Sequence, residues 1–175
     1  MSTHFPFVLT LALGIAGFGV LAGCNQSAQA PPANDGTSAT EGDDYNPHDV
    51  PITEEQKAEL RQQTAKFADA VATIKQFRNE IEQETAAGIP ANPFKAHQAL
   101  DKADLLLQWL PEIARNSGVP KEQWETVNTS ANDLRTLFEQ VHQNIDNKQD
   151  PNFPAVAGEI DQKIAGLEAI AAPQP

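Results

Sequence analysis

Apolar side chains recur at steps of three and four residues in four stretches of the chain. In an α-helix such steps return to one face, whereas a strand would need alternation at every second residue. Each stretch therefore predicts an amphipathic helix with one buried stripe. The stripes are Leu60, Phe67, Ile74 and Ile81; then Phe94, His97, Leu100, Leu107 and Leu110; then Trp124, Val127, Ala131, Leu134, Phe138, Val141 and Ile145; then Phe153, Val156, Ile160, Ile164, Leu167 and Ile170.

Cap and turn residues place the ends of these helices. Thr53 and Gln56 form a capping-box pair, so the first helix begins there and is expected to run unbroken to Ala87-Gly88. Pro111 lies inside the second stripe and is expected to kink or interrupt that helix, because proline removes a donor and clashes with the preceding turn. The breaks after the second and third helices fall at Ser117-Gly118-Val119-Pro120 and Asp150-Pro151-Asn152.

Four amphipathic helices joined by short turns predict an all-α fold, an antiparallel up-down-up-down four-helix bundle over residues 51–172. Cys24 is the only cysteine, so no disulfide can staple the bundle and its core must supply the stability. The folded part resembles no family beyond generic four-helix bundles. The lumenal lipoprotein of the Q type on cyanobacterial photosystem II is similar in architecture alone.

The tetrapeptide Leu21-Ala22-Gly23-Cys24 follows an uncharged apolar run from Phe7 to Val20. That run of about 14 residues suits the core of a secretory signal and is short of the ~20 residues needed to span a bilayer. The tetrapeptide resembles the lipobox of bacterial lipoproteins. This resemblance implies diacylglyceryl transfer to the Cys24 thiol and cleavage between Gly23 and Cys24, which removes residues 1–23 as a signal peptide. Acylation of the new amino group follows, with palmitate as the expected fatty acid.

Two other fates of the N-terminus stay open. Ala28-Gln29-Ala30 fits the pattern of an ordinary cleavage site, which would release a soluble secreted protein beginning at Pro31. An uncleaved N-terminal anchor is the other. The lipobox favours a lipid-anchored protein of the bacterial cell envelope. Asn25 follows the cysteine where enteric lipoproteins of the inner membrane have Asp, which favours the outer membrane, with the domain facing the periplasm or the cell surface.

Residues 24–50 predict a lipidated cysteine followed by a flexible acidic linker. Large apolar side chains are almost absent from this stretch, so it cannot bury enough surface to offset the entropy of ordering. The formal net charge of −12 disfavours nucleic acid and anionic lipid head groups as partners. The expected membrane partner is therefore reached through the lipid on Cys24, and a protein partner of unspecified kind is left open.

The histidine and carboxylate side chains match few of the patterns that are typical of metal, haem or catalytic sites. No Ser-His-Asp order and no phosphate loop occurs, so we expect no enzyme activity and no cofactor. The Cys-x-x-Cys-His motif of c-type haem is also absent. His97 lies on the apolar stripe, with Asp101 four residues and Asp104 seven residues further on, and these three are weak candidates for metal ligands. A core histidine bonded to a carboxylate or to the backbone is the plainer interpretation.

Glu139-Gln140-Val141-His142 has the Glu-x-x-His spacing of di-iron bundles, but no second copy exists and His142 lies beside the apolar stripe. We therefore expect no di-iron site.

The sequence as a whole predicts a lipid-anchored helical bundle that acts as a non-catalytic binding or scaffolding module. The alternative is a bundle that binds a metal or a non-covalent haem through His97.

Overall fold

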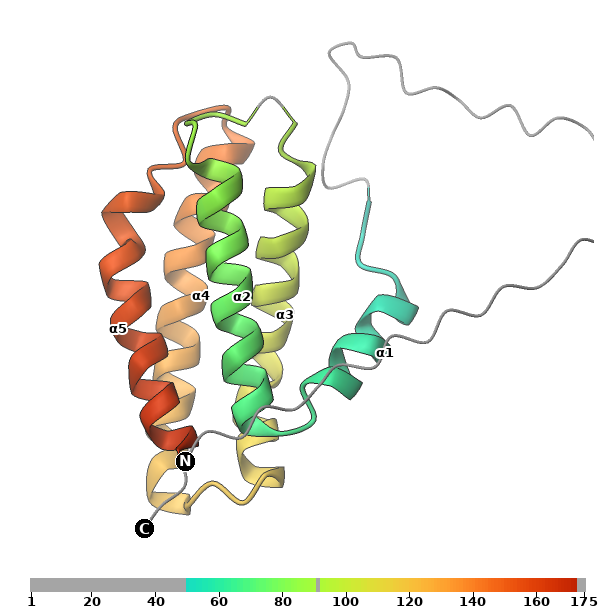
Figure 1. Ribbon diagram of the computed structural model, residues 1–175, viewed down its shortest axis with the longest axis vertical. Coiled ribbons are helices and arrows are strands. Elements are labelled where there is room, and N and C mark those ends of the chain that lie inside the picture. Colours follow the sequence, from blue (N-terminus) through green and yellow to red (C-terminus); the bar gives the residue numbers. More distant parts are fainter. Residues whose placement is uncertain (1–49, 91, 173–175) are drawn as a thin grey trace, which may run out of the picture. The chain divides into compact units, whose positions relative to one another are not determined.

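The part of the chain that the computed structural model describes, residues 50–90 and 92–172, contains α-helices and one short 3-10 helix (Figure 1). The capping box of Thr53 is present as predicted: its hydroxyl accepts from the Gln56 N–H, and the Gln56 side chain accepts from the Thr53 N–H. The elements in chain order are α1 (Glu54–Gln63), α2 (Phe67–Thr85), α3 (Phe94–Asn116), η2 (Lys121–Gln123), α4 (Trp124–Asp146) and α5 (Phe153–Ala171).

Helices α2 to α5 pack side by side and antiparallel, while α1 lies to one side of them (Figure 1). Each of the four packs against its neighbour in the chain, and α5 closes the arrangement by packing against α2. Short turns connect them, which is why successive helices run in opposite directions. The predicted all-α, antiparallel character is confirmed.

The predicted signal peptide, the Gly23–Cys24 cleavage site and the linker up to residue 49 lie outside the described residues. Within the described ranges, no helix is both long enough and apolar enough to cross a membrane.

The expectation of one unbroken helix from Thr53 to Ala87-Gly88 is wrong, because the structure divides it into α1 and α2. The Thr64 hydroxyl donates to the Leu60 carbonyl at 2.6 Å, and the backbone then becomes extended at Lys66, with φ −107° and ψ 146°. The Phe67 N–H, which opens α2, donates to the Ser117 hydroxyl at 2.9 Å. Leu60 and Phe67 are both buried as predicted, so the stripe is correct although the helix is not continuous.

Replacing Ser117 by alanine is expected to lower the free energy of unfolding by about 1 kcal/mol, since the first N–H of α2 then loses its only side-chain cap. Chemical denaturation followed by circular dichroism measures this. Ser130→Ala, on the partly exposed middle of α4, is the matched control and should leave stability within about 0.5 kcal/mol. Equal stability of the two variants would show that the bond to Ser117 contributes nothing.

Pro111 does not interrupt α3, contrary to expectation, and the helix continues to Asn116. Leu110 and Ala114, on either side of the proline, are fully buried. Their packing against the other helices outweighs the backbone hydrogen bond that proline cannot make. The predicted end of this helix is confirmed, since Gly118 adopts a positive φ of 78° two residues after it.

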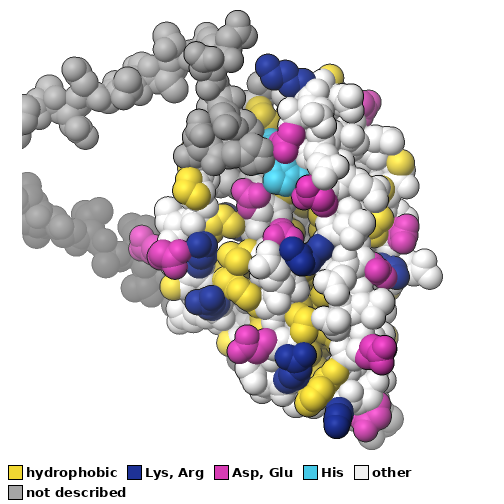
Figure 2. All heavy atoms as spheres, turned by 180° about the vertical axis from the view of Figure 1, so that it is seen from behind, with side chains coloured by type: hydrophobic (Ala, Val, Ile, Leu, Met, Phe, Trp, Pro, Cys, Tyr) yellow, Lys and Arg dark blue, Asp and Glu magenta, His cyan; other side chains and the backbone are white. Residues whose placement is uncertain are grey.

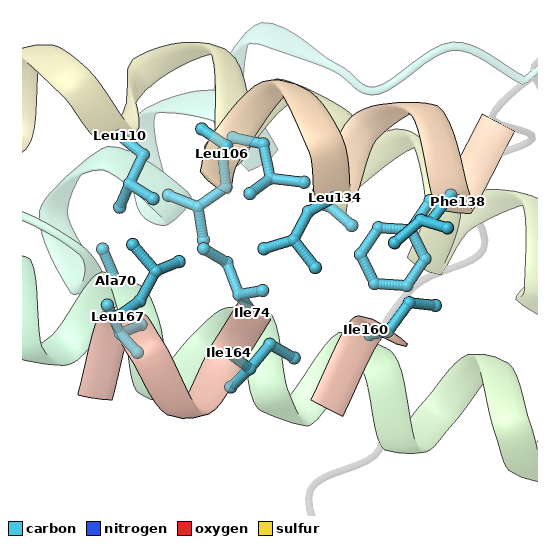
Figure 3. Close-up of a cluster of buried hydrophobic side chains, with 14 of the residues drawn as sticks. Ala70, Ile74, Leu106, Leu110, Leu134, Phe138, Ile160, Ile164 and Leu167 are labelled. Atoms are coloured by element: carbon cyan, nitrogen blue, oxygen red, sulfur yellow. The ribbon is translucent and has the colours of Figure 1, made fainter. Parts of the chain in front are cut away.

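The core lies between α2, α3, α4 and α5 and is built from the predicted stripes (Figure 3). Alanines at several helix contacts are fully buried, which lets the helix backbones approach closely. The largest fully buried apolar side chains are Ile74, Ile81, Leu100, Leu106, Leu107, Leu110, Leu134, Ile160, Leu167, Val71 and Val127.

An arginine on α2 ties α5 to the bundle. Two nitrogens of Arg78 donate to the two carboxylate oxygens of Asp161, at 2.8 and 3.0 Å, and Nη1 also donates to Glu82. Burial disfavours the charged guanidinium, but the hydrogen bonds and negative charges of Glu82 and Asp161 outweigh it and raise the pKa of Arg78 above its ordinary value. A raised pKa in a cation stabilises the fold below the unfolded pKa, so this contribution is fully present at neutral pH and is lost only in strong alkali.

Candidate metal centre

His97 lies in the first turn of α3 and points into the bundle. Its side chain is only 2% exposed, although most buried side chains around it are apolar. The helix places it there because the neighbouring stripe residues Ala96 and Leu100 are themselves buried against the other helices. The sequence prediction of His97 as a core-facing residue is confirmed.

The partner of His97 comes from the opposite end of α4. Because α3 and α4 run antiparallel, the first turn of α3 faces the last turns of α4. This brings Nε2 of His142 within 2.8 Å of Nδ1 of His97, a hydrogen-bond distance in which one ring nitrogen donates and the other accepts. The ring centroids are 4.7 Å apart and the rings are inclined at 69°, an edge-to-face arrangement.

A carboxylate from α4 completes the cluster. Asp146 follows His142 by four residues, so its side chain lies on the same helix face, one turn further on. Its Oδ1 is 3.3 Å from Nε2 of His97 and 3.8 Å from Nε2 of His142. Each of the three residues thus offers one ligand atom, and these atoms lie within 4.8 Å of one another. We call His97, His142 and Asp146 the two-histidine cluster.

Glu139 stands behind this cluster. Its Oε2 is 3.9 Å from Nδ1 of His142, the ring nitrogen that does not contact His97. The Gln143 amide donates to the other carboxylate oxygen, Oε1, at 2.9 Å and holds it in place. A carboxylate on the far nitrogen of an imidazole orients the ring and raises its basicity. The Glu-x-x-His spacing noticed in the sequence therefore places the Glu139 carboxylate 3.9 Å from the far ring nitrogen of His142.

The cluster opens to solvent on the α4 side. The His142 side chain is 15% exposed and that of Asp146 is 33% exposed, whereas His97 lies beneath them. Figure 2 shows a histidine surface at this place, bordered by acidic side chains. The ends of α3 and α4 that meet here carry opposite partial charges, which largely cancel, so the carboxylates set the local field. That field attracts cations.

Of the two aspartates proposed with His97 from the sequence, the structure gives side-chain partners for Asp104. Asp104 accepts from Arg135 Nε at 2.7 Å and from the Gln108 amide at 2.6 Å, so it joins α3 to α4. Asp101 is partly buried on α3, one turn after His97, and does not belong to the three-residue cluster. Asp146, which was not among the candidates from the sequence, lies 3.3 Å from His97.

Sequence reasoning set His142 aside and did not consider Asp146. The local signal was present, since His142 and Asp146 share one helix face at a spacing of four. Their pairing with His97 depends on the register between α3 and α4, which no local pattern contains. A comparison of residues equally far from the α3–α4 turn would have brought the two histidines near each other.

Apart from the two-histidine cluster, the described part of the chain has a hollow between α4 and α5. It has a volume of about 490 Å³, and its lining is mostly polar. Lys163, on its wall, pairs with Asp133 across the two helices, and this hydrogen bond raises the pKa of Lys163 above its ordinary value. The lining residues are Ser130, Gly158, Glu159, Gln162, Lys163 and Gly166.

Comparison of the chain with protein-family models, with curated proteins and with solved structures found no match.

Proposed function

We propose that the protein is a lipid-anchored module of the bacterial cell envelope, held by acyl chains on Cys24 and presenting an up-down-up-down four-helix bundle for binding or scaffolding. The observation that carries this proposal is the lipobox-like tetrapeptide Leu21-Ala22-Gly23-Cys24, which ends at the only cysteine of the chain. Helices α2 to α5 form the bundle, and α1 is an addition to it. In this proposal the module is not catalytic.

The spacing between anchor and domain supports this arrangement. Helix α1 begins at Glu54, about 30 residues after Cys24, and a flexible chain of that length has a root-mean-square reach of roughly 27–33 Å. Such a reach would place the bundle clear of the lipid head groups. The net charge of −12 disfavours adsorption to an anionic membrane, so the acyl chains would be the only attachment. We propose the outer membrane, with the domain facing the periplasm or the cell surface, because Asn25 and not Asp follows Cys24.

Replacing Cys24 by serine is expected to abolish lipidation and leave residues 1–23 attached, because the lipid acceptor and the processed bond are both lost. Intact-mass measurement of protein purified from membranes tests this, since the wild-type chain should begin at Cys24 and carry the added mass of acyl chains. Ala30→Leu is the matched control: it blocks the alternative cleavage after Ala28-Gln29-Ala30 and should change nothing. A wild-type N-terminus at Pro31 would overturn the lipid anchor.

The binding role has its own test. Crosslinking in intact cells should recover a protein partner with the wild-type chain and much less of it with Cys24→Ser, which lacks the anchor. Recovery of no partner, together with turnover of a substrate by the purified chain, would contradict a binding or scaffolding module.

A second candidate function, cation binding, is favoured by one specific observation. The two-histidine cluster brings two imidazoles and a carboxylate together at the rim of the bundle. The sequence raised the alternative of a bundle that binds a metal or haem through His97, and the cluster supports the metal.

A further inference from the structure

We infer that the two-histidine cluster binds one zinc-type divalent transition-metal cation through a ring nitrogen of His97, Nε2 of His142 and Oδ1 of Asp146. This site does not depend on the proposed lipid anchor, because all three ligands lie on α3 and α4 of the folded domain.

The donor set selects the class of cation. Imidazole nitrogen suits Zn²⁺, Cu²⁺ and Ni²⁺, whereas Ca²⁺ and Mg²⁺ prefer all-oxygen surroundings. Two histidines and one carboxylate are a set that catalytic zinc sites use, with the fourth position left to water or to substrate. The acidic border of the cluster raises the local concentration of any divalent cation.

The distances fit a metal of this size. Zinc lies about 2.0–2.2 Å from nitrogen and oxygen ligands, so two ligand atoms of a tetrahedral site are roughly 3.3 Å apart. The separations from Asp146 Oδ1 to His97 Nε2 and to His142 Nε2 are 3.3 and 3.8 Å. The 2.8 Å contact between the two histidines involves the other ring nitrogen of His97, Nδ1, so it does not join two ligand atoms when Nε2 of His97 holds the metal. Zinc binding through Nε2 of His97 would require Nε2 of His142 to leave this hydrogen bond, by rotation of the partly exposed His142 ring.

The surroundings already provide what a metal-bound histidine needs. Glu139 faces Nδ1 of His142 and leaves Nε2 directed at the cluster. This is the order of carboxylate, histidine and metal that fixes the ring and strengthens its nitrogen as a ligand. His97 is held by burial in the bundle core, so this ligand is oriented before the metal arrives.

A hydrogen-bonded, edge-to-face pair of histidines that holds no metal is the competing explanation, and titration with zinc distinguishes the two. The experiment uses the full chain without a histidine tag, carrying Cys24→Ser so that no thiol competes. Isothermal titration with zinc chloride should show one zinc per chain, while calcium and magnesium chloride should give no binding. Zinc should also raise the unfolding temperature.

Variants assign the site. His142→Ala and Asp146→Asn remove ligands from the partly exposed rim and should each weaken zinc binding at least tenfold, an expectation of roughly the size seen for supporting residues of metal sites. Glu139→Gln removes only the supporting carboxylate and should weaken it by roughly 10- to 100-fold without changing the stoichiometry. Asp69→Asn, on the exposed face of α2, is the matched control and should bind as the parent does.

Denaturation of each metal-free variant shows whether it is folded. Absence of zinc binding by the parent would overturn the proposal, and so would parent-like affinity in both His142→Ala and Asp146→Asn. If the native chain carries lipid on Cys24 but the Cys24→Ser chain binds no zinc, the metal site is rejected and the anchor is kept. If the Cys24→Ser chain binds zinc but the native chain carries no lipid, the anchor is rejected and the metal site is kept.

Discussion

Replacing Ile74 by alanine is expected to lower the free energy of unfolding by about 2–5 kcal/mol, the largest stability loss of the substitutions considered for this domain. Ile74 is fully buried in the middle of α2 (Figure 3). The substitution removes apolar surface from the core and leaves a cavity that the packed helices cannot fill. Because no disulfide can compensate in a chain with one cysteine, much of the net stability of the domain would be lost.

Urea denaturation followed by far-ultraviolet circular dichroism measures this loss. Ile89→Ala is the matched control, because the same change is made where the side chain is 56% exposed, and it should cost less than about 0.5 kcal/mol. A loss below about 1 kcal/mol for Ile74→Ala would mean that α2 is not packed as the structure has it.

Replacing Pro111 by alanine is expected to have the opposite sign and to stabilise the domain by roughly 1–3 kcal/mol. A proline in a helix interior is about 3 kcal/mol less favourable than alanine, because it lacks an N–H and its ring crowds the preceding turn. Proline also restricts the unfolded chain, which stabilises the folded state by about 0.4–1 kcal/mol. This contribution is lost in Pro111→Ala and reduces the net gain in stability. The side chain is partly exposed, so little packing is lost with the ring.

Pro154→Ala is the control for this second prediction. Pro154 lies in the first turn of α5, where the N–H has no partner within the helix and the fixed φ is favourable. This variant should be no more stable than the parent. A Pro111→Ala variant that is equally or less stable than the parent would show that α3 is shaped to accept the proline.

The helical stripes could be read from the sequence because their information is local. A residue such as Leu134 or Ile160 is marked as buried by its own spacing to neighbours three and four positions away. The same spacing could not reveal the break between α1 and α2, since Leu60 and Phe67 keep the rhythm across it. The break includes a bond from Phe67 to Ser117, 50 residues further along the chain.

The candidate site shows the same contrast between local spacing, which the sequence reveals, and contacts between helices, which it does not. His97 was recognisable as a polar residue on an apolar stripe, but the carboxylates assigned to it were those nearest in sequence. Asp104 in fact bonds to Arg135, and a carboxylate that the sequence did not indicate, Asp146 of α4, lies 3.3 Å from His97. A short step along one helix is visible in a sequence, whereas a contact between two helices depends on how they are aligned.

By itself the sequence determined the helical class, the buried face of each helix and most of the turns, and it contains the lipobox-like tetrapeptide on which the proposed anchor depends. These follow from spacing, caps and breakers, which act over a few residues. Only the tertiary structure decided that α1 turns away at Thr64, that α3 passes through Pro111, and that His97 meets His142 and Asp146. Each of these is set by packing between helices, where burial of distant side chains outweighs the local preference of the backbone.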